Sequence, residues 1–322
     1  MSATVGIAAL AAQGPLLEAK REVQYFELAA RTILNRTKPN LPFTWTINPY
    51  RGCEFGCRYC YARFTHEFMG LDDPRAFEDR IYAKANVQEL LRRDLRRTAR
   101  GEAIAIGTAT DPYQPAEGRF RRTRALLEVF AEGTGRRLSI TTKSNRILQD
   151  RELLQAVARR NELHINMTIT TLDAGLARLL EPRAPHPELR LRVVRELSAA
   201  GLSVGVFPNP ILPLITDQEP RLDRLAQAAK EAGAQYFGGG ALFLMPSAQR
   251  VFFPFLRDYF PHLARQYERR YAHDAYLRGP YRDRLRERVQ AIRERHGLAS
   301  GPGQQEIEFE QQGAQLTLFT LQ

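Results

Sequence analysis

The three cysteines of the chain lie within eight residues of one another. Cys53, Cys57 and Cys60 follow the pattern C-x3-C-x2-C, and the 322-residue sequence has no other cysteine. An odd, clustered set is a poor disulfide framework, so these thiols indicate a metal or cluster site in a reducing compartment. Three thiolates on one tight loop can bind three irons of a [4Fe-4S] cubane and leave the fourth iron open for a small chelating ligand.

A structural zinc ion is the alternative interpretation of the same residues. His66 would be its fourth ligand, which gives the spacing C-x3-C-x2-C-x5-H. This spacing differs from the usual paired patterns of zinc sites. Gly52 and Gly56 favour a loop that wraps closely around a cluster, where a Cβ would obstruct it.

Further polar residues follow short apolar runs, where parallel strands would end. Thr110 and Asp111 follow the run 103–108, Lys143 ends the run 138–143, and Thr168 and Thr170 lie in the run 163–170. A hydroxyl and a carboxylate at a strand end can hold an ammonium group. The alternatives are turn chemistry at Asp111, a solvent-facing lysine at 143, and threonines that only fill a strand.

An alternation of strands and helices would position these side chains. Apolar runs rich in β-branched or aromatic residues cover 43–48, 103–108, 138–143, 163–170, 202–207 and 236–244, and helical stretches cover 86–100, 123–132, 150–160, 187–200 and 218–232. Six strands alternating with helices predict βα units and a parallel sheet whose carboxyl edge carries the chemistry. We therefore predict an α/β fold with a partial (β/α)6 barrel over residues 43–245.

Three further segments flank this core. Residues 1–42 are predicted as a helical lead-in, with a mixed helix over 16–34. Residues 246–297 are predicted as a helical extension whose last helix, over 281–295, has one apolar face. Residues 298–322 are predicted as a flexible linker that ends in an apolar tail.

The cysteine motif and its surroundings resemble a known family. Residues 48–63 read Asn-Pro-Tyr-Arg-Gly-Cys-Glu-Phe-Gly-Cys-Arg-Tyr-Cys-Tyr-Ala-Arg, with an aromatic residue, Tyr59, before the last cysteine. This string, placed after the first of six strands, resembles the radical S-adenosylmethionine (SAM) superfamily and, within it, the spore photoproduct lyase-like branch, also described as DNA-repair-photolyase-related. The resemblance covers about residues 31–295.

The resemblance implies a cofactor set and a reaction class. A [4Fe-4S] cluster would be held by Cys53, Cys57 and Cys60, with SAM on the open iron. Reductive cleavage of SAM would give a 5′-deoxyadenosyl radical that abstracts hydrogen from a substrate. A reductant such as flavodoxin or ferredoxin would supply the electron.

The resemblance also implies roles for single residues near SAM. Thr110 and Asp111 match a Ser-Asp pair beside the methionine part of SAM, and Lys143 matches a lysine that holds its carboxylate. Tyr59 is included among the residues around the cofactors.

The remaining parts of SAM have candidate contacts on later strands. Thr168 or Thr170 would lie near the ribose hydroxyls, and Asn209 would line the adenine. The segment from Glu181-Pro-Arg183 to Leu189-Arg-Leu matches a supporting segment of the family, with Arg183 as a candidate ligand.

One position departs from the family pattern. Spore photoproduct lyase has an additional cysteine at the end of its second strand, which returns a hydrogen atom to the product. The matching residue here is Thr108. Because a hydroxyl is a far poorer hydrogen donor than a thiol, repair of the spore lesion is not expected.

The charge of the chain favours a polyanionic partner. Forty-seven basic residues against 36 acidic residues give a net charge of +11. Lys and Arg displace counterions from phosphates, so a nucleic acid partner, and with it nucleic acid repair or modification, is predicted. The alternative is a basic surface of a soluble protein that has no such partner. Arginines of the segment 265–295 alternate with tyrosines that could stack on bases, although a solvated helical face is the alternative. These tyrosines are Tyr267, Tyr271, Tyr276 and Tyr281.

Two other functions stay open. One is an enzyme that acts on a protein or small molecule, and the other is a non-catalytic iron–sulfur protein. No run approaches the roughly 20 apolar residues of a membrane span, and the N-terminus lacks the basic start of a secretory signal, so a cytoplasmic location is expected.

The last residues resemble a short docking peptide. Gln315, Leu318 and Phe319 match the Gln-Leu-x-Leu-Phe peptide by which bacterial polymerases and repair proteins bind the sliding clamp. The apolar pair would fill a pocket and Gln315 would bond to its rim. A final strand that packs on the barrel is the alternative.

Overall fold

The main sheet of the protein has seven strands, six of which are parallel. The computed structural model describes residues 16–20, 23–38 and 41–301. The sheet order is β11-β10-β9-β8-β7-β4-β3, in which β3 alone runs antiparallel to its neighbour. The parallel strands thus follow chain order, which confirms the predicted α/β class with a parallel sheet. The strands are β3 (Leu34–Arg36), β4 (Trp45–Ile47), β7 (Ala103–Ile106), β8 (Arg137–Thr142), β9 (Glu162–Thr168), β10 (Ser203–Phe207) and β11 (Tyr236–Phe237).

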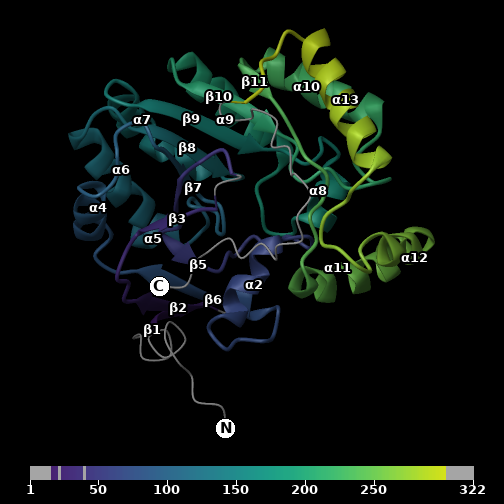
Figure 1. Cartoon of the computed structure of the whole chain (residues 1–322), viewed down its shortest axis with the longest axis horizontal. Helices are drawn as coiled ribbons and strands as arrows, with labels where there is room; N and C mark the ends of the chain where they lie inside the picture. The colour runs from purple at the N-terminus through teal and green to yellow at the C-terminus, as the bar shows by residue number, and fades with distance from the viewer. Residues whose placement is uncertain (1–15, 21–22, 39–40, 302–322) are drawn as a thin grey trace.

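Helices connect these strands close to the predicted positions. Figure 1 shows them along the outside of the sheet. Their apolar sides pack against the strands in one core, in which Ile106, Ile140 and Ile165 are almost fully buried. The long connections are α4 (Val87–Leu95), α6 (Arg122–Glu132), α7 (Arg151–Ala158), α9 (Pro187–Ala199) and α10 (Glu219–Glu231), and the short ones are η1 (Tyr61–Arg63), α2 (Phe64–Glu67), α3 (Ala76–Asp79), α5 (Glu117–Phe120), η2 (Asn145–Asp150) and α8 (Ala174–Leu180).

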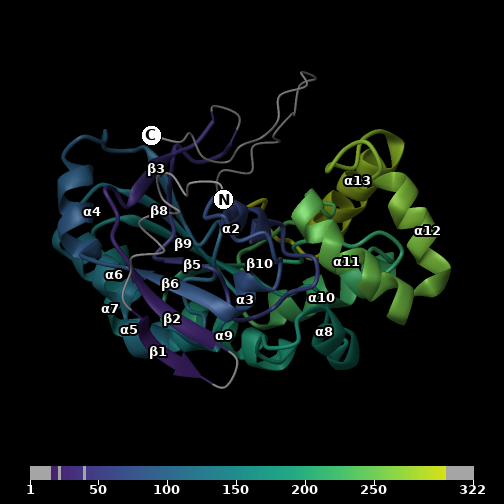
Figure 2. The same ribbon diagram turned by 90° about the horizontal axis from the view of Figure 1, so that it is seen from below.

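The predicted helix over residues 16–34 is wrong, because this segment forms strands of a second sheet. The sheet has the order β1-β2-β6-β5, and its strands are β1 (Leu16–Lys20), β2 (Val23–Leu28), β5 (Tyr50–Arg51) and β6 (Arg80–Lys84). Val23 and Tyr25 are buried while Gln24 is exposed, which is a strand period. The pairing of β2 with β6, a distant strand, overrides the helix propensity of the Glu and Arg residues. Figure 2 shows β1, β2 and β6 side by side.

The region of residues 246–297 is mainly helical, as predicted. It consists of α11 (Pro246–Tyr259), α12 (Pro261–Arg270) and α13 (Pro280–Arg295), which lie on the right in Figures 1 and 2. Phe252 and Leu256 are almost fully buried in a second apolar cluster, which also contains Cys53 and Cys57. The helical extension therefore packs next to the cysteine loop and is part of the same folded body.

The four tyrosines between residues 265 and 295 all contact other residues of the protein, and two of them are buried. Tyr267 and Tyr271 are buried, and their hydroxyls donate to the carbonyls of Pro213 and Leu242 at 2.5 and 2.8 Å. Tyr276 stacks on Phe243 with ring centroids 4.2 Å apart. The Tyr281 hydroxyl donates to Asp217 at 2.6 Å. The prediction of a base-stacking role is therefore wrong for Tyr267 and Tyr271, whose rings lie in the core. Tyr276 and Tyr281 are half-buried, and their base-stacking role stays a prediction.

Two expectations concern the location of the chain and its tail. Among the described residues, none of the helices combines the length and the apolar character that a membrane crossing requires. The clamp-binding peptide around Gln315 lies outside the described residues and stays a prediction.

A carboxylate connects the start of β3 to α4. Asp94 Oδ2 accepts hydrogen bonds from Thr32 Oγ1 at 2.5 Å and from the backbone N–H of Ile33 at 2.8 Å. Burial alone would raise the pKa of Asp94, but these hydrogen bonds lower it below its ordinary value. The ionised form therefore stabilises this connection.

We expect Asp94→Ala to lower the free energy of unfolding by about 1–3 kcal/mol, because it leaves buried donors unpaired. Since the folded-state pKa of Asp94 is depressed, its contribution is present above the unfolded pKa of about 3.9 and is lost as the pH falls through the folded value. Urea unfolding at several pH values measures this. The exposed Asp258→Ala variant is the control. A difference between Asp94→Ala and wild type that stays constant down to pH 3 would contradict the assignment.

Candidate functional site

The three cysteines lie on one loop between β5 and η1, beyond the carboxyl end of β4. Cys53 and Cys57 are buried and Cys60 is half-buried, and all three are free thiols. Burial raises the pKa of each thiol, that of Cys57 to about 12. The negative charge of Cys60 further raises the pKa of Cys53 and of Cys57, so the three side chains lie close to one another.

The backbone of the cysteine loop is fixed by segments that are distant in sequence. The N–H of Cys53 donates to the carbonyl of Phe77 at 2.8 Å, and the N–H of Arg58 donates to the carbonyl of Leu180 at 2.9 Å. The carbonyl of Gly52 accepts from Thr110 Oγ1 at 2.6 Å and from Gln114 Nε2 at 3.0 Å. With its backbone groups satisfied in this way, the loop can direct its thiols into the interior.

The two glycines of the motif are required by the protein behind the loop. Gly52 has φ +82° and Gly56 has φ +63°, a region that L side chains rarely adopt. A Cβ on Gly52 would lie 2.8 Å from the carbonyl oxygen of Arg80, and one on Gly56 would lie 2.7 Å from Glu78 Oε2. The glycines do allow close approach, as predicted, but the obstructed neighbours are α3 and β6 rather than a cluster.

The buried ion pair of Arg63 with Glu78 supports the cysteine loop. Arg63 pairs with Glu78, and its guanidinium also donates to the carbonyls of Cys57 at 2.9 Å and of Pro74 at 2.8 Å. This role was not predicted from the sequence. The only available signal was that Arg63 is the last residue of the string that carries the family resemblance.

The structure brings Asp111 and Lys143 together, from the loops after β7 and β8. The Asp111 carboxylate accepts from Thr142 Oγ1 at 2.6 Å, from the N–H of Tyr113 at 2.9 Å and from the N–H of Lys143 at 2.7 Å. Burial raises the pKa of Asp111 even though these hydrogen bonds lower it. The predicted turn chemistry at Asp111 is therefore present, since its side chain caps the N–H two residues later.

Lys143 lies beside the cysteines. Its Nζ is 5.9 Å from the centre of the Tyr59 ring. Burial alone would lower the pKa of Lys143, but the negative charges of Cys57, Glu181 and Asp111 raise it above the ordinary value. Because its pKa is raised, the half-buried side chain keeps its positive charge next to the thiols.

Tyr59 belongs to a buried polar network. Its hydroxyl donates to Glu181 and lies 3.1 Å from Thr170 Oγ1, which donates to the same carboxylate at 2.7 Å. Arg190 forms an ion pair with Glu181 at 2.5 Å, and both side chains are 1 % exposed. Burial alone would raise the pKa of Glu181, but the charges of Arg190 and Lys143 lower it. The sequence predicted this segment, which includes Arg190, as scaffold, but it predicted no separate role for Arg190.

Other predicted residues lie around this centre with different partners. Thr168 is buried at the end of β9, and its carbonyl accepts from Arg190 at 3.1 Å. Asn209 is half-buried and its Oδ1 accepts from the N–H of Gly240 at 2.8 Å. Arg183 is exposed on the outer side of the cysteine loop, where its N–H donates to the carbonyl of Phe55 at 3.2 Å.

His66 and Thr108 also have defined surroundings. His66 is buried with Nε2 3.0 Å from the carbonyl of Arg80, and burial lowers its pKa to about 4. In the described part of the chain, no three His, Cys, Asp or Glu side chains are grouped to hold one metal ion. That finding concerns a single ion, whereas a cubane places each thiolate on a different iron. Thr108 Oγ1 accepts from Asn48 at 3.1 Å, and its carbonyl accepts from the hydroxyl of Tyr61.

Three comparisons with known proteins identify the family. Residues 47–226 match the family model described as the Radical SAM superfamily. This chain belongs to the radical SAM superfamily. An uncharacterized protein of Mycobacterium tuberculosis, Rv2578c, is 35% identical over 303 residues, which cover 92% of this chain and 88% of that protein. An uncharacterized protein of Methanocaldococcus jannaschii, MJ0683, is 28% identical over 199 residues, or 62% of this chain and 71% of that protein.

Solved structures of radical SAM enzymes share the fold. Spore photoproduct lyase in complex with dinucleoside spore photoproduct has a TM-score of 0.62 at 15% identity and covers 84% of this chain and 79% of its own. SuiB of Streptococcus suis bound to precursor peptide SuiA has a TM-score of 0.50 at 16% identity and covers 79% and 47%. The likeness to a radical SAM, spore photoproduct lyase-like protein is thereby confirmed. Enzymes of the superfamily typically use a [4Fe-4S] cluster and SAM and need a reductant.

The contribution of the Arg190–Glu181 ion pair to stability can be tested against a control arginine on the same helix, α9. Arg190→Met leaves the Glu181 charge buried and unpaired, so we expect the free energy of unfolding to fall by about 3–5 kcal/mol. The control Arg192→Met removes an exposed pair with Glu196 and should cost about 0.5 kcal/mol or less. Guanidinium unfolding measures both. The double variant Glu181→Gln/Arg190→Met should recover part of the loss, and equal losses for the two single arginine variants would contradict the assignment.

Proposed function

We propose that this chain is a radical SAM enzyme that holds one [4Fe-4S] cluster on Cys53, Cys57 and Cys60 and acts on a nucleic acid. The observation that carries the proposal is the group of three free thiols on one loop, two of them buried, with the Lys143 ammonium beside Cys57. The donor set fits a cubane with one free iron, because the loop carries three cysteines and the sequence contains no fourth. The bound cluster and SAM would supply reductive cleavage of SAM to a 5′-deoxyadenosyl radical for hydrogen abstraction.

The chain's own residues would bind the amino acid part of SAM. A carboxylate offers about four lone-pair positions, and Asp111 uses three of them within the protein. The Thr110 hydroxyl donates to Gly52 and accepts from Gln114, which leaves one acceptor position. Each residue can therefore still accept one hydrogen bond from an ammonium group, and Lys143 can pair with the carboxylate.

The remaining SAM contacts are assigned to the ends of later strands. The Thr170 hydroxyl donates to Glu181, whereas Thr168 has its backbone held by Arg190. We therefore assign Thr168 to the ribose, with Thr170 and Tyr59 as its support, and Asn209 to the adenine. In this proposal the parallel sheet is a partial (β/α)6 barrel over residues 43–245, followed by the helical extension 246–297, and its walls exclude water from the radical.

A nucleic acid substrate is supported by charge and by fold. The net charge is +11, and Arg265, Arg269, Arg284 and Arg286 are exposed on α12 and α13. Several neighbours of these arginines are paired within the protein, such as Arg257 with Glu268. Spore photoproduct lyase, which has the same fold, was solved with a dinucleoside lesion. Since Thr108 replaces the hydrogen-donating cysteine, we propose repair or modification of another site rather than of the spore lesion.

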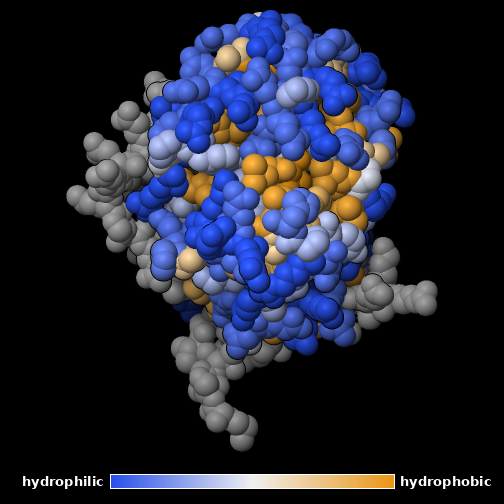
Figure 3. Space-filling model, turned by 90° about the vertical axis from the view of Figure 1, so that its right-hand side faces the viewer, coloured by the Kyte–Doolittle hydropathy of each residue, from blue (hydrophilic) through white to orange (hydrophobic). Residues whose placement is uncertain are grey.

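A protein substrate is the second candidate. Figure 3 shows apolar side chains gathered in the middle of the face that the C-terminal helices form, with polar side chains around them. Apolar patches rimmed by polar residues mark protein contact sites. SuiB, which shares the fold, was solved with a precursor peptide. In either case we propose flavodoxin or ferredoxin as the reductant and the cytoplasm as the location.

The cluster assignment has a direct test. We expect wild-type protein reconstituted anaerobically with iron and sulfide to show cluster absorbance and, with SAM and dithionite, to form 5′-deoxyadenosine. Cys57→Ala should lose both, because the cubane loses one of three ligands. A cluster that never cleaves SAM would indicate a non-catalytic iron–sulfur protein, and a tightly bound zinc ion would sink the proposal.

The role of Lys143 is tested separately. Lys143→Gln should retain the cluster and raise the KM for SAM about 10- to 100-fold, because a charge-assisted hydrogen bond contributes about 1.5–3 kcal/mol. The exposed Lys230→Gln variant is the control. An unchanged KM in Lys143→Gln would show that this lysine serves the fold alone.

A further inference from the structure

Four exposed arginines lie at the amino end of the parallel sheet, opposite to the edge that carries the cysteine loop. They belong to the loops that lead into β7 and β9, the two strands that flank β8. The helices before β7, β8 and β9 are α4, α6 and α7, which lie together on the left of Figure 1, away from the C-terminal helices. The four residues, which form the amino-end patch, are Arg96, Arg97, Arg100 and Arg159.

Hydrogen bonds hold the loops of the amino-end patch against one another. The half-buried Arg136, which precedes β8, donates from its guanidinium to the carbonyls of Leu95 and Ala99, each at 3.0 Å. The N–H of Gly135 donates to the carbonyl of Arg160 at 3.0 Å. The loop before β8 is therefore bonded to the loops on both of its sides, and the four arginines belong to one surface.

The positive charges of the amino-end patch are not neutralised within the described part of the chain. Among those residues, no hydrogen bond or ion pair engages the guanidinium of any of the four arginines. Two carboxylates at this end of the sheet already have partners. Glu132 pairs with Arg92 at 2.7 Å, and Glu162 pairs with Arg137 at 3.0 Å. The patch therefore presents four free cations to the solvent.

The arginines at this end of the sheet also repel one another. Burial lowers the pKa of Arg136 below its ordinary value, and the positive charge of Arg100 lowers it further, although Glu102 opposes this. A fold that gathers like charges loses some stability. Such an arrangement is typical of a surface that binds a partner of opposite charge, because function is commonly gained at the cost of stability.

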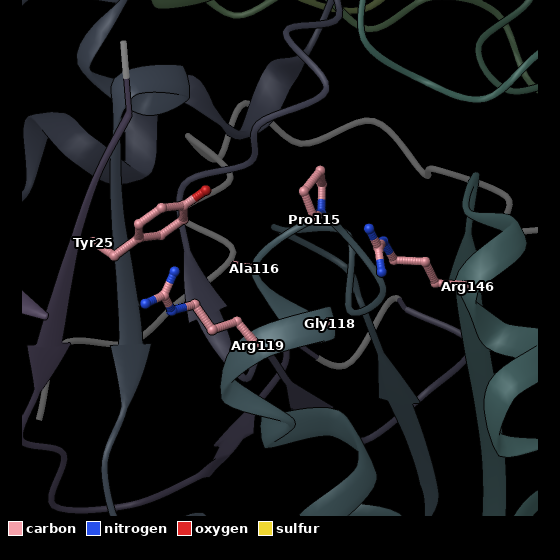
Figure 4. A pocket seen from close by; sticks show the side chains of 6 residues that line it. All are labelled: Tyr25, Pro115, Ala116, Gly118, Arg119 and Arg146. Carbon is pink, nitrogen blue, oxygen red and sulfur yellow. The ribbon is translucent and has the colours of Figure 1, made fainter. Parts of the chain in front are cut away.

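Two arginines near the cysteine loop have different surroundings. Figure 4 shows Arg119 and Arg146 in the wall of a pocket of about 290 Å³. Arg119 lies over the ring of Phe120 at 5.9 Å and has a further partner within the protein. Because Arg119 is already engaged, this pocket has one guanidinium for a ligand, whereas the amino-end patch has four.

We propose that the amino-end patch binds the phosphate backbone of a nucleic acid, at a distance from the reaction site. The inference rests on the proposed function and gives its nucleic acid substrate a second contact. A planar guanidinium matches two phosphate oxygens with parallel hydrogen bonds. A DNA duplex carries one negative charge per about 1.7 Å of its axis, so one molecule can reach four separated cations at once. Since phosphate contacts carry no sequence information, we expect binding that does not depend on sequence.

The length of the sheet sets the size of a nucleic acid that can reach both places. β9 has seven residues, and a strand rises about 3.3 Å per residue, so its two ends lie about 23 Å apart. At about 3.4 Å per base pair, this distance corresponds to about seven base pairs. A duplex of 24 base pairs is therefore long enough to contact the patch and the reaction site.

The test uses the reconstituted full-length protein and a fluorescent duplex DNA of 24 base pairs, with Kd measured by anisotropy from 50 to 200 mM KCl. Each phosphate contact contributes about 0.9 to the slope of log Kd against log salt. Arg97→Gln/Arg100→Gln/Arg159→Gln removes three contacts and should lower the slope by about 2.7 and weaken binding at least 10-fold at 50 mM. An unchanged midpoint of thermal unfolding would show that this loss does not come from unfolding.

A matched control separates the patch from the overall charge. Arg195→Gln/Arg221→Gln/Arg224→Gln removes the same charge from exposed positions on α9 and α10. Its slope should stay within about 0.3 of wild type, which is less than half a phosphate contact. Equal slopes in the patch and control variants would overturn the proposal. Polyglutamate that competes as well as unlabelled DNA, at equal concentration of negative charge, would also overturn it, in favour of an acidic protein partner.

The two proposals fail in different measurements. Formation of 5′-deoxyadenosine from SAM and dithionite in the absence of nucleic acid reports on the cluster site. We expect this rate to be unchanged in the patch variant, whose substitutions lie at the other end of the sheet. Absence of 5′-deoxyadenosine formation in wild type would refute the proposed enzyme, whereas an unaltered salt slope in the patch variant would refute the amino-end patch alone.

Discussion

The backbone carbonyl of Gly52 joins two loops of the candidate site. The oxygen of Gly52 accepts hydrogen bonds from Thr110 and Gln114, which joins the cysteine loop to the loop after β7. Asp111, which follows Thr110, accepts a hydrogen bond from the backbone N–H of Lys143. This bond joins the loop after β7 to the loop after β8. Three strand ends are thereby held in one arrangement. Because hydrogen bonds between buried backbone and side-chain groups cannot be exchanged for water without cost, this arrangement persists without a ligand.

Charge balance is the second constraint on the site. Lys143 and Arg190 are the positive groups near Cys57, and Glu181 is the negative group that both of them face. A cluster requires the thiols as thiolates, which adds negative charge to a buried region. The two cations offset that charge in a low-dielectric interior, where an unpaired anion would be strongly disfavoured. The ion pair of Arg190 with Glu181 also keeps the Tyr59 ring in place beside Lys143.

The parallel sheet and the cysteine motif could be predicted because both depend on residues that lie close together in the sequence. Short β-branched runs separated by helical stretches define the six parallel strands, and three cysteines in eight residues define the loop. The second sheet could not be predicted in the same way, since β2 is stabilised by β6 more than fifty residues later along the chain. The buried tyrosines Tyr267 and Tyr271 were misjudged for a related reason. A tyrosine in an arginine-rich helix has the same local pattern whether its ring faces a base or, as in Tyr267, the core.

The buried arginines that support the site could not be predicted from the sequence either. Arg63 and Arg190 are single arginines among 47 basic residues, and only their burial against Glu78 and Glu181 sets them apart. The candidate SAM contacts were found through a resemblance. The structure adds which of their hydrogen-bonding positions are already used and which remain.

The backbone contacts of the cysteine loop also set an order of assembly. Arg58 donates to Leu180, and Arg183 donates back to Phe55, so the loop is completed by residues more than 120 positions away. A short peptide with the same three thiols would lack these hydrogen-bond partners and would stay open in water. On the ribosome, the nascent chain must therefore emerge beyond α8 before the loop can close, so the three thiols come together late in synthesis.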